Sequence, residues 1–190
     1  MNKEILHIKN MVCPRCIASV EDILHELNYS VEQVLLGEAV LNETLSVNQL
    51  AVLKDKLLKQ GFELLEDKKD KIVEAVKTHV IQLVKNPDKH SSTKLSTYLS
   101  KELGYDYSHI SSLFTASQHI TIEKYVILQK IEYVKELLSY NELTVSEISD
   151  TLNYSSVAAL SAQFKSITGI TPSKFKSSDQ ARKSLDNLIP

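Results

Sequence analysis

The sequence predicts an α+β protein with two domains, a small one at residues 1–67 in the element order βαββαβ and an all-α one at residues 72–180. Apolar residues in the first part switch between strand-like and helix-like spacing. In the second part they keep helical spacing, and one helical pattern occurs twice, about 50 residues apart. Only four Gly and four Pro interrupt the 190 residues, which favours helix for most of the chain.

Composition excludes several classes of protein. The apolar content of 43% is that of an ordinary soluble chain and not of a disordered one. No stretch approaches the roughly 20 apolar residues that span a bilayer, and the charged start MNKEILHIKN does not resemble a secretory signal. We therefore expect a cytoplasmic protein with no membrane partner. No acid/base pair, nucleophile constellation or phosphate-binding loop occurs, so we do not expect an enzyme.

The first predicted elements are a strand, a loop and a helix. Residues 5–8 alternate apolar and polar side chains, as a half-buried strand does. After a loop, apolar residues recur at helical spacing from Ile17 to Leu27. Pro14 lies near the first turn of this helix, where its missing N–H costs nothing.

The other elements of this domain are strands at residues 31–36 and 39–41, a helix that ends at Gly61 and a strand at residues 62–65. Gly37 suits the tight reversal between the two short strands, because it adopts a positive φ without strain. Ser46 and Gln49 form the capping box of the helix. The resulting order, βαββαβ, is the split βαβ or ferredoxin-like arrangement.

Two cysteines lie where the first helix begins. The helix N-terminal amides and the charge of Arg15 both favour a thiolate at Cys13 and Cys16, and the thiolate is the form that binds metal or attacks a disulfide. Two sulfurs can hold one soft monovalent ion such as Cu(I) in a near-linear arrangement, whereas Zn(II) takes four ligands. His7 is expected to face solvent from its strand rather than to act as a third ligand.

The motif Met11-x-Cys13-x-x-Cys16, followed by this element order and by Gly61-Phe62-Glu63, resembles the heavy-metal-associated domain of copper chaperones and copper pumps. The resemblance covers residues 3–67. It implies that Cys13 and Cys16 bind Cu(I) or another thiophilic ion, that Met11 packs beneath the loop, and that Phe62 shields the site.

The chain departs from that family at three positions. Asn10 stands where the family has Gly, and Pro14 and Arg15 replace small residues between the cysteines. Two alternatives to metal binding stay open: an idle cysteine pair in a retained fold, and a redox pair of the Cys-Pro-x-Cys kind.

A charged run separates the two predicted domains. Residues 66–71 are all charged, and residues 68–71 are interpreted as a linker. The next helix begins at Ile72 and ends before Asn86-Pro87, and residues 88–93 form a polar loop.

Two helix-turn-helix units are predicted, at residues 94–117 and 144–166. Gly104 makes the turn of the first unit, and Asn153, which tolerates the left-handed conformation, replaces it in the second. A long helix at residues 121–140, capped by Thr121, joins the two units. A capping box of Thr144 and Glu147 begins the second unit, and Thr171-Pro172 begins a closing helix.

The runs TVSEISDTLNYSSVAALSAQFKSITGITPSKFK and KYVILQKIEYVKELL strongly resemble the DNA-binding domain of AraC-type transcriptional regulators, which are bacterial. The resemblance covers residues 72–177. It implies that the second helix of each unit enters the major groove of double-stranded DNA, in successive grooves about 34 Å apart.

Carried over position by position, the base-reading candidates are Ser108, His109, Ser111, Ser112, Val157, Ala158, Ser161 and Ala162. The phosphate-contacting candidates are Lys124, Lys130, Lys165, Lys174 and Lys176. Family members commonly have Arg where this chain has Ser112 and Ala162. We therefore expect weaker or A·T-leaning recognition, or binding as a homodimer.

The charge distribution agrees with DNA binding by the second part of the chain. Residues 1–70 carry 8 basic and 12 acidic side chains, and residues 71–190 carry 14 basic and 12 acidic ones, but only two of the 22 basic residues are Arg. The sequence thus predicts a transcription regulator that responds to a soft metal or to thiol state. The alternative is a metal-carrier or thiol protein whose helical part is a protein-interaction module.

Overall fold

The computed structural model describes residues 3–87 and 93–177, and the chain divides into two compact units, Met1–Thr78 and His79–Pro190. Most of the predicted polar loop at residues 88–93 and the end of the predicted domain at residues 178–180 lie outside the described residues. No helix in the described part of the chain combines the length and the apolar character needed to cross a membrane.

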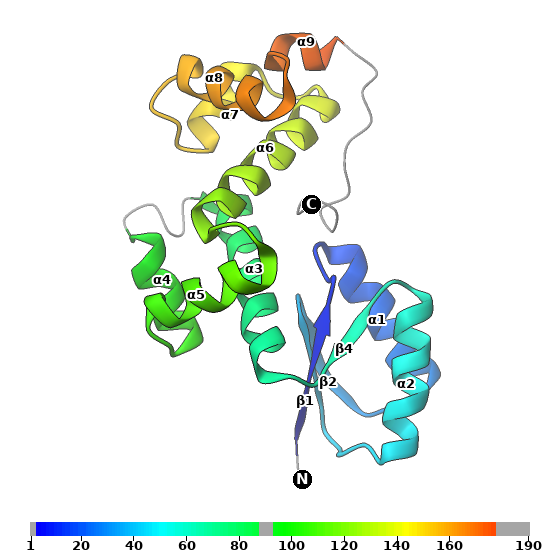
Figure 1. Ribbon diagram of the computed structural model, residues 1–190. Coiled ribbons are helices and arrows are strands. Elements are labelled where there is room, and N and C mark those ends of the chain that lie inside the picture. The colour runs from blue at the N-terminus through cyan, green and yellow to red at the C-terminus, as the bar shows by residue number, and fades with distance from the viewer. Residues whose placement is uncertain (1–2, 88–92, 178–190) are drawn as a thin grey trace. The chain divides into compact units, whose positions relative to one another are not determined.

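Residues 3–67 of the first unit form one four-stranded sheet and two helices in the predicted order. The elements are β1 (Glu4–Lys9), α1 (Pro14–Glu26), β2 (Val31–Leu35), β3 (Glu38–Leu41), α2 (Val47–Lys59) and β4 (Glu63–Leu65). The strand order is β2-β3-β1-β4, and every neighbouring pair is antiparallel. Figure 1 shows α1 and α2 on the same face of this sheet.

The core of the first unit lies between that face and the two helices. Leu6 and Ile8 of β1 point into it, together with Val20 and Leu24 of α1, because alternate residues of a strand point to one face. Met11 is 1% exposed and belongs to the same core, as expected. The capping box at the start of α2 is confirmed, since the Ser46 side chain accepts from the backbone N–H of Gln49.

Residues 68–71 of the charged run are helical instead of forming a linker. Helix α3 spans Lys68–Lys85, so residues 68–71 are its first turn, and the two units divide within this helix. The physical reason is Asp67, whose carboxylate accepts from the backbone N–H of Lys69 (2.7 Å) and of Asp70 (3.4 Å). A carboxylate in this position satisfies amides that have no partner within the helix.

The second unit contains six further helices in its described residues. They are α4 (Leu95–Leu103), α5 (Tyr107–Gln118), α6 (Ile122–Tyr140), α7 (Val145–Thr151), α8 (Val157–Thr168) and α9 (Pro172–Lys176). Each predicted cap of α6, α7 and α9 is present, because Thr121, Thr144 and Thr171 each accept from the backbone N–H three residues later. Asn153 has a φ of 55°, as its role in the turn requires.

The two helix-turn-helix units place one aromatic residue at equivalent points of their cores. Phe114 of α5 packs on Tyr125, with ring centroids 5.5 Å apart, and Phe164 of α8 packs on Phe175, with centroids 5.6 Å apart. Both phenylalanines are fully buried. Helix α6 contributes to both cores and thereby joins the two helix-turn-helix units (Figure 1).

Replacing Gly37 by alanine is expected to destabilise the first unit by about 2–3 kcal/mol. A Cβ at this position would lie 2.9 Å from Oγ1 of Thr78, and the φ of +85° strains any residue with a side chain. Gly61→Ala is the matched control, because its φ is +84° but no atom lies within 4 Å of the added Cβ. Urea unfolding measures the loss of free energy of unfolding in both variants. A larger loss in Gly37→Ala would report the clash with Thr78, and equal losses would argue against it.

Candidate nucleic-acid interface and thiol site

The two cysteines form one site at the start of α1. Cys13 is the residue that precedes the helix, Cys16 lies in its first turn, and the two Sγ atoms are 3.4 Å apart. Both are free thiols and partly buried. This spacing lets the two sulfurs share one ligand.

The two thiols differ in acidity. Burial alone would raise the pKa of Cys13, but the hydrogen bond from the Cys16 amide, the side-chain contact with Cys16, the hydrogen bond from the Arg15 amide and the charge of Arg15 hold that pKa below its usual value. Burial raises the pKa of Cys16, and the neighbouring Cys13 raises it further. Cys13 is therefore the first of the pair to become a thiolate, which is the reactive and metal-binding form.

The residues around the pair fit an ion that needs two sulfur ligands. Within residues 3–87 and 93–177, no group of three or more His, Cys, Asp or Glu side chains could hold a metal. Such a pair suits a soft monovalent ion and does not suit Zn(II), which takes four ligands. Phe62 is buried in the core that Cys16 packs against, while His7 is half-buried on β1.

Asn10 anchors the loop before the cysteines. Its φ is 72°, in the left-handed region that Asn tolerates better than most residues. Its side-chain amide donates to the carbonyl of Gly61 (2.9 Å), and its backbone N–H donates to Oε1 of Glu74 (3.1 Å). Sequence reasoning missed Glu74, because only the fold brings α3 to this loop.

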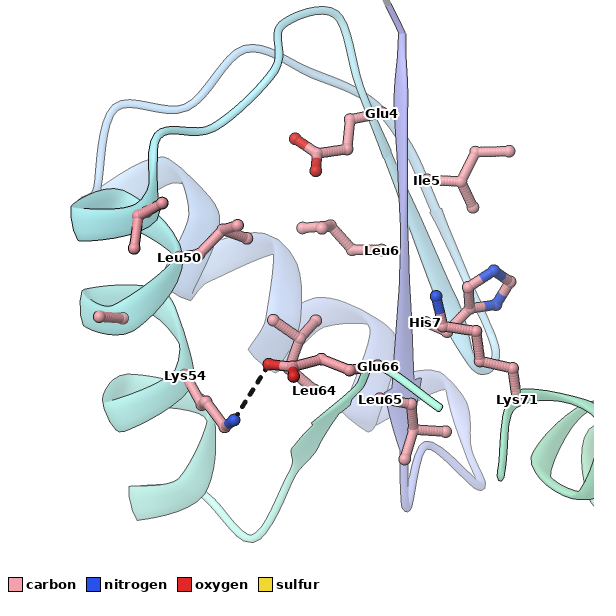
Figure 2. Close-up of a pocket in the computed structure, with 12 residues that line it drawn as sticks. Glu4, Ile5, Leu6, His7, Leu50, Lys54, Leu64, Leu65, Glu66 and Lys71 are labelled. Atoms are coloured by element: carbon pink, nitrogen blue, oxygen red, sulfur yellow. Dashed lines mark hydrogen bonds and ion pairs between the residues drawn. The ribbon is translucent and has the colours of Figure 1, made fainter. Parts of the chain in front are cut away.

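A pocket of 480 Å³ lies elsewhere in the first unit, between β1 and the start of α2. Figure 2 shows Leu6, Leu50 and Leu64 together on one side of β1, and His7 on the other side. An ion pair between Lys54 and Glu66 (3.2 Å) borders the pocket. Neither cysteine lines it, so it is separate from the thiol site.

The predicted base-reading residues lie on α5 and α8. Ser108, His109 and Ser112 are exposed on α5, and Ser111 is partly buried. On α8, Val157, Ala158 and Ala162 are exposed, and Ser161 is partly buried. The α5 face therefore offers hydroxyls and an imidazole, whereas the α8 face offers mainly methyl groups.

The five predicted phosphate-contacting lysines fall into two groups. Lys124, Lys165, Lys174 and Lys176 are exposed. Lys130 differs, because its Nζ donates to the carbonyl of Leu152 (3.1 Å) and lies 5.2 Å from the centre of the Tyr154 ring. Burial lowers its pKa. Lys130 thus bridges α6 and the turn of the second helix-turn-helix unit, and we omit it from the proposed phosphate contacts.

Comparison with known proteins identifies the second part of the chain. Residues 99–178 match a family described as a helix-turn-helix domain, over a region that contains both turns and the long helix between them. The C-terminal part is an AraC-type helix-turn-helix domain. Its fold resembles the C-terminal domain of AraT, a response regulator from Geobacillus stearothermophilus, with a TM-score of 0.51 and 17% identity, over 62% of this chain and 94% of that one.

Relatives of this AraC-type domain are named as regulators. The Msm operon regulatory protein of Streptococcus mutans is 28% identical over 139 residues, which are 72% of this chain and 48% of that protein. An HTH-type transcriptional regulator of Staphylococcus aureus is 27% identical over 113 residues, which are 60% of this chain and 14% of that protein. The chain thus spans less than half the length of these relatives.

Proposed function

We propose that this chain is a sequence-specific, DNA-binding transcription regulator that acts in the bacterial cytoplasm. The observation that carries the proposal is the pair of helix-turn-helix units on one long helix, with the faces of α5 and α8 exposed. In this arrangement each of these helices enters the major groove, one helical turn of the duplex apart. Exposed lysines then contact phosphates, which position the protein without reading sequence.

The chemistry of the two helices supports a preference for A·T base pairs in the half of the site that α8 reads. Methyl groups of Val157, Ala158 and Ala162 suit contact with the methyl group of thymine. The bidentate contact of Arg with guanine, worth about 1–3 kcal/mol, has no residue to make it at Ser112 or Ala162. Weaker contacts of this kind favour binding as a homodimer.

The first unit supplies the regulatory part of the proposal. Its βαββαβ element order and its β2-β3-β1-β4 strand order support a ferredoxin-like fold, and its cysteine motif resembles that of heavy-metal-associated domains. Cys13 and Cys16 would hold Cu(I) or another thiophilic ion, with Met11 beneath the loop and Phe62 shielding the site. When bound, a monovalent ion would offset one of the two thiolate charges, and it would shift DNA binding only if its affinity differs between two arrangements of the protein.

The absence of arginine from α5 and α8 favours one alternative function. The helical part would then be a protein-interaction module, and the first unit would carry metal or exchange thiols. DNA binding discriminates between the two proposals.

The deciding experiment selects bound sequences from random duplex DNA, with and without Cu(I), for the full chain and for Cys13→Ser/Cys16→Ser. We expect one enriched motif whose affinity changes with Cu(I) only when both cysteines are present. Failure to enrich any motif would refute the proposal of a DNA-binding regulator. A motif bound equally with and without Cu(I) would refute the proposal of a metal sensor. Binding should also weaken steeply with salt, because each phosphate contact releases counterions.

A further inference from the structure

The cysteine loop is connected to α3 by a short chain of hydrogen bonds within the first unit. The Cys16 thiol donates to the carbonyl of Asn10 (3.9 Å), and the backbone N–H of Asn10 donates to Glu74 (3.1 Å). The same residue is fixed from a third side by the carbonyl of Gly61. One residue in the left-handed conformation thus contacts both a cysteine and a carboxylate of another helix.

Glu74 is buried to a degree that is unusual for a glutamate. The residue is 6% exposed, and its second carboxylate oxygen pairs with Nζ of Lys77 at 3.0 Å. A buried ion pair gains little stability over a well-packed apolar pair, so the pair by itself does not explain why a charge lies here. The Asn10 amide gives this carboxylate a specific hydrogen-bonding partner in the cysteine loop.

We propose that Glu74 is a positioning residue that couples the state of Cys16 to helix α3; this inference rests on the proposed function of the thiol site. When Cys16 becomes a metal ligand it loses its S–H, and the carbonyl of Asn10 then loses that donor. Because the backbone N–H of Asn10 is hydrogen-bonded to Glu74, a change in the position of Asn10 also displaces Glu74 and perturbs helix α3. This helix continues to Lys85 and so includes the first residues of the second unit.

The first test measures how strongly Glu74 holds the loop, with no metal and no DNA. In the full chain carrying Cys13→Ser, the rate at which a small neutral reagent alkylates Cys16 is compared among variants. Glu74→Met/Lys77→Met removes the acceptor without leaving a buried lysine unpaired, and should raise the rate about fivefold, the factor expected for one hydrogen bond of ordinary strength. Glu74→Gln/Lys77→Met should stay near the parent rate, because the amide oxygen can still accept from Asn10 and no buried lysine is left unpaired.

A matched control separates positioning from a general loss of stability. Glu132 and Lys135 form another buried pair three residues apart, in α6, with side chains 5% and 12% exposed. Glu132→Met/Lys135→Met should leave the alkylation rate of Cys16 unchanged. An equal increase in both double variants, or no increase at Glu74, would overturn the proposal.

The second test measures the coupling itself. Attachment of a methylthio group to Cys16 removes the S–H, and amide hydrogen exchange is then followed in residues 70–78. We expect faster exchange there in the Cys13→Ser parent and no change in Glu74→Met/Lys77→Met. The same change in both proteins would show that α3 responds without Glu74. Neither test requires metal, so a chain indifferent to Cu(I) would refute the metal sensor while these results still decide the role of Glu74.

Discussion

Replacing Ala162 by glutamate is expected to lower DNA affinity at least about 100-fold without unfolding the protein. Ala162 is exposed on α8, so the larger side chain has room in the free protein. In the complex its carboxylate would meet the negative DNA without a partner, and an uncompensated charge in an interface costs about 3–5 kcal/mol. Fluorescence anisotropy with the selected duplex measures the affinity, and circular dichroism verifies the fold.

Two further variants show whether the effect belongs to the reading faces. Ser112→Glu makes the equivalent change on the exposed face of α5 and should reduce affinity to a similar extent. Ser139→Glu adds the same charge at an exposed position near the end of α6, and should change affinity less than about threefold, because screened surface charges interact weakly. Equal losses in all three variants would indicate a general charge effect and would contradict groove binding by α5 and α8.

Local signals predicted much of the fold. The caps at Ser46, Thr121, Thr144 and Thr171 were predicted correctly because a capping side chain and its target amide are three residues apart in sequence. The turn at Asn153 was also predictable locally, because Asn tolerates the left-handed conformation that the turn requires. Elements defined by such short-range chemistry can be located without the tertiary structure.

Residues whose roles depend on distant contacts could not be predicted in this way. The charged run at residues 66–71 has the composition of a linker, yet Asp67 caps it, and Ile72 and Val73 are buried. Lys130 has the composition of a phosphate contact, but the fold places its Nζ at the carbonyl of Leu152, 22 residues later. Glu74 is 64 residues from its partner Asn10. Charge patterns in the sequence therefore identified candidate ligands of DNA without separating them from structural side chains.

Replacing Phe164 by alanine is expected to cost about 3–5 kcal/mol of the free energy of unfolding of the second helix-turn-helix unit. Phe164 is fully buried and contacts Phe175 of α9, within a core that includes Ile131, Leu152 and Leu160. The loss is a large part of the 5–15 kcal/mol that is typical of a whole domain. Phe164→Leu keeps most of the volume and should cost less than about half as much.

The position of this damage tests how the two helix-turn-helix units depend on each other. The core around Phe164 is formed by the C-terminal half of α6 together with α7, α8 and α9, while Phe114 packs on Tyr125 near the other end of α6. Hydrogen exchange in Phe164→Ala should therefore accelerate in α7 to α9 and much less in α4 and α5. Since docking of α5 and α8 in the major groove requires both helix-turn-helix units, specific DNA binding should be lost even though the first helix-turn-helix unit stays folded. Simultaneous loss of protection in α4 and α5 would instead mean that α6 makes the two units one cooperative structure.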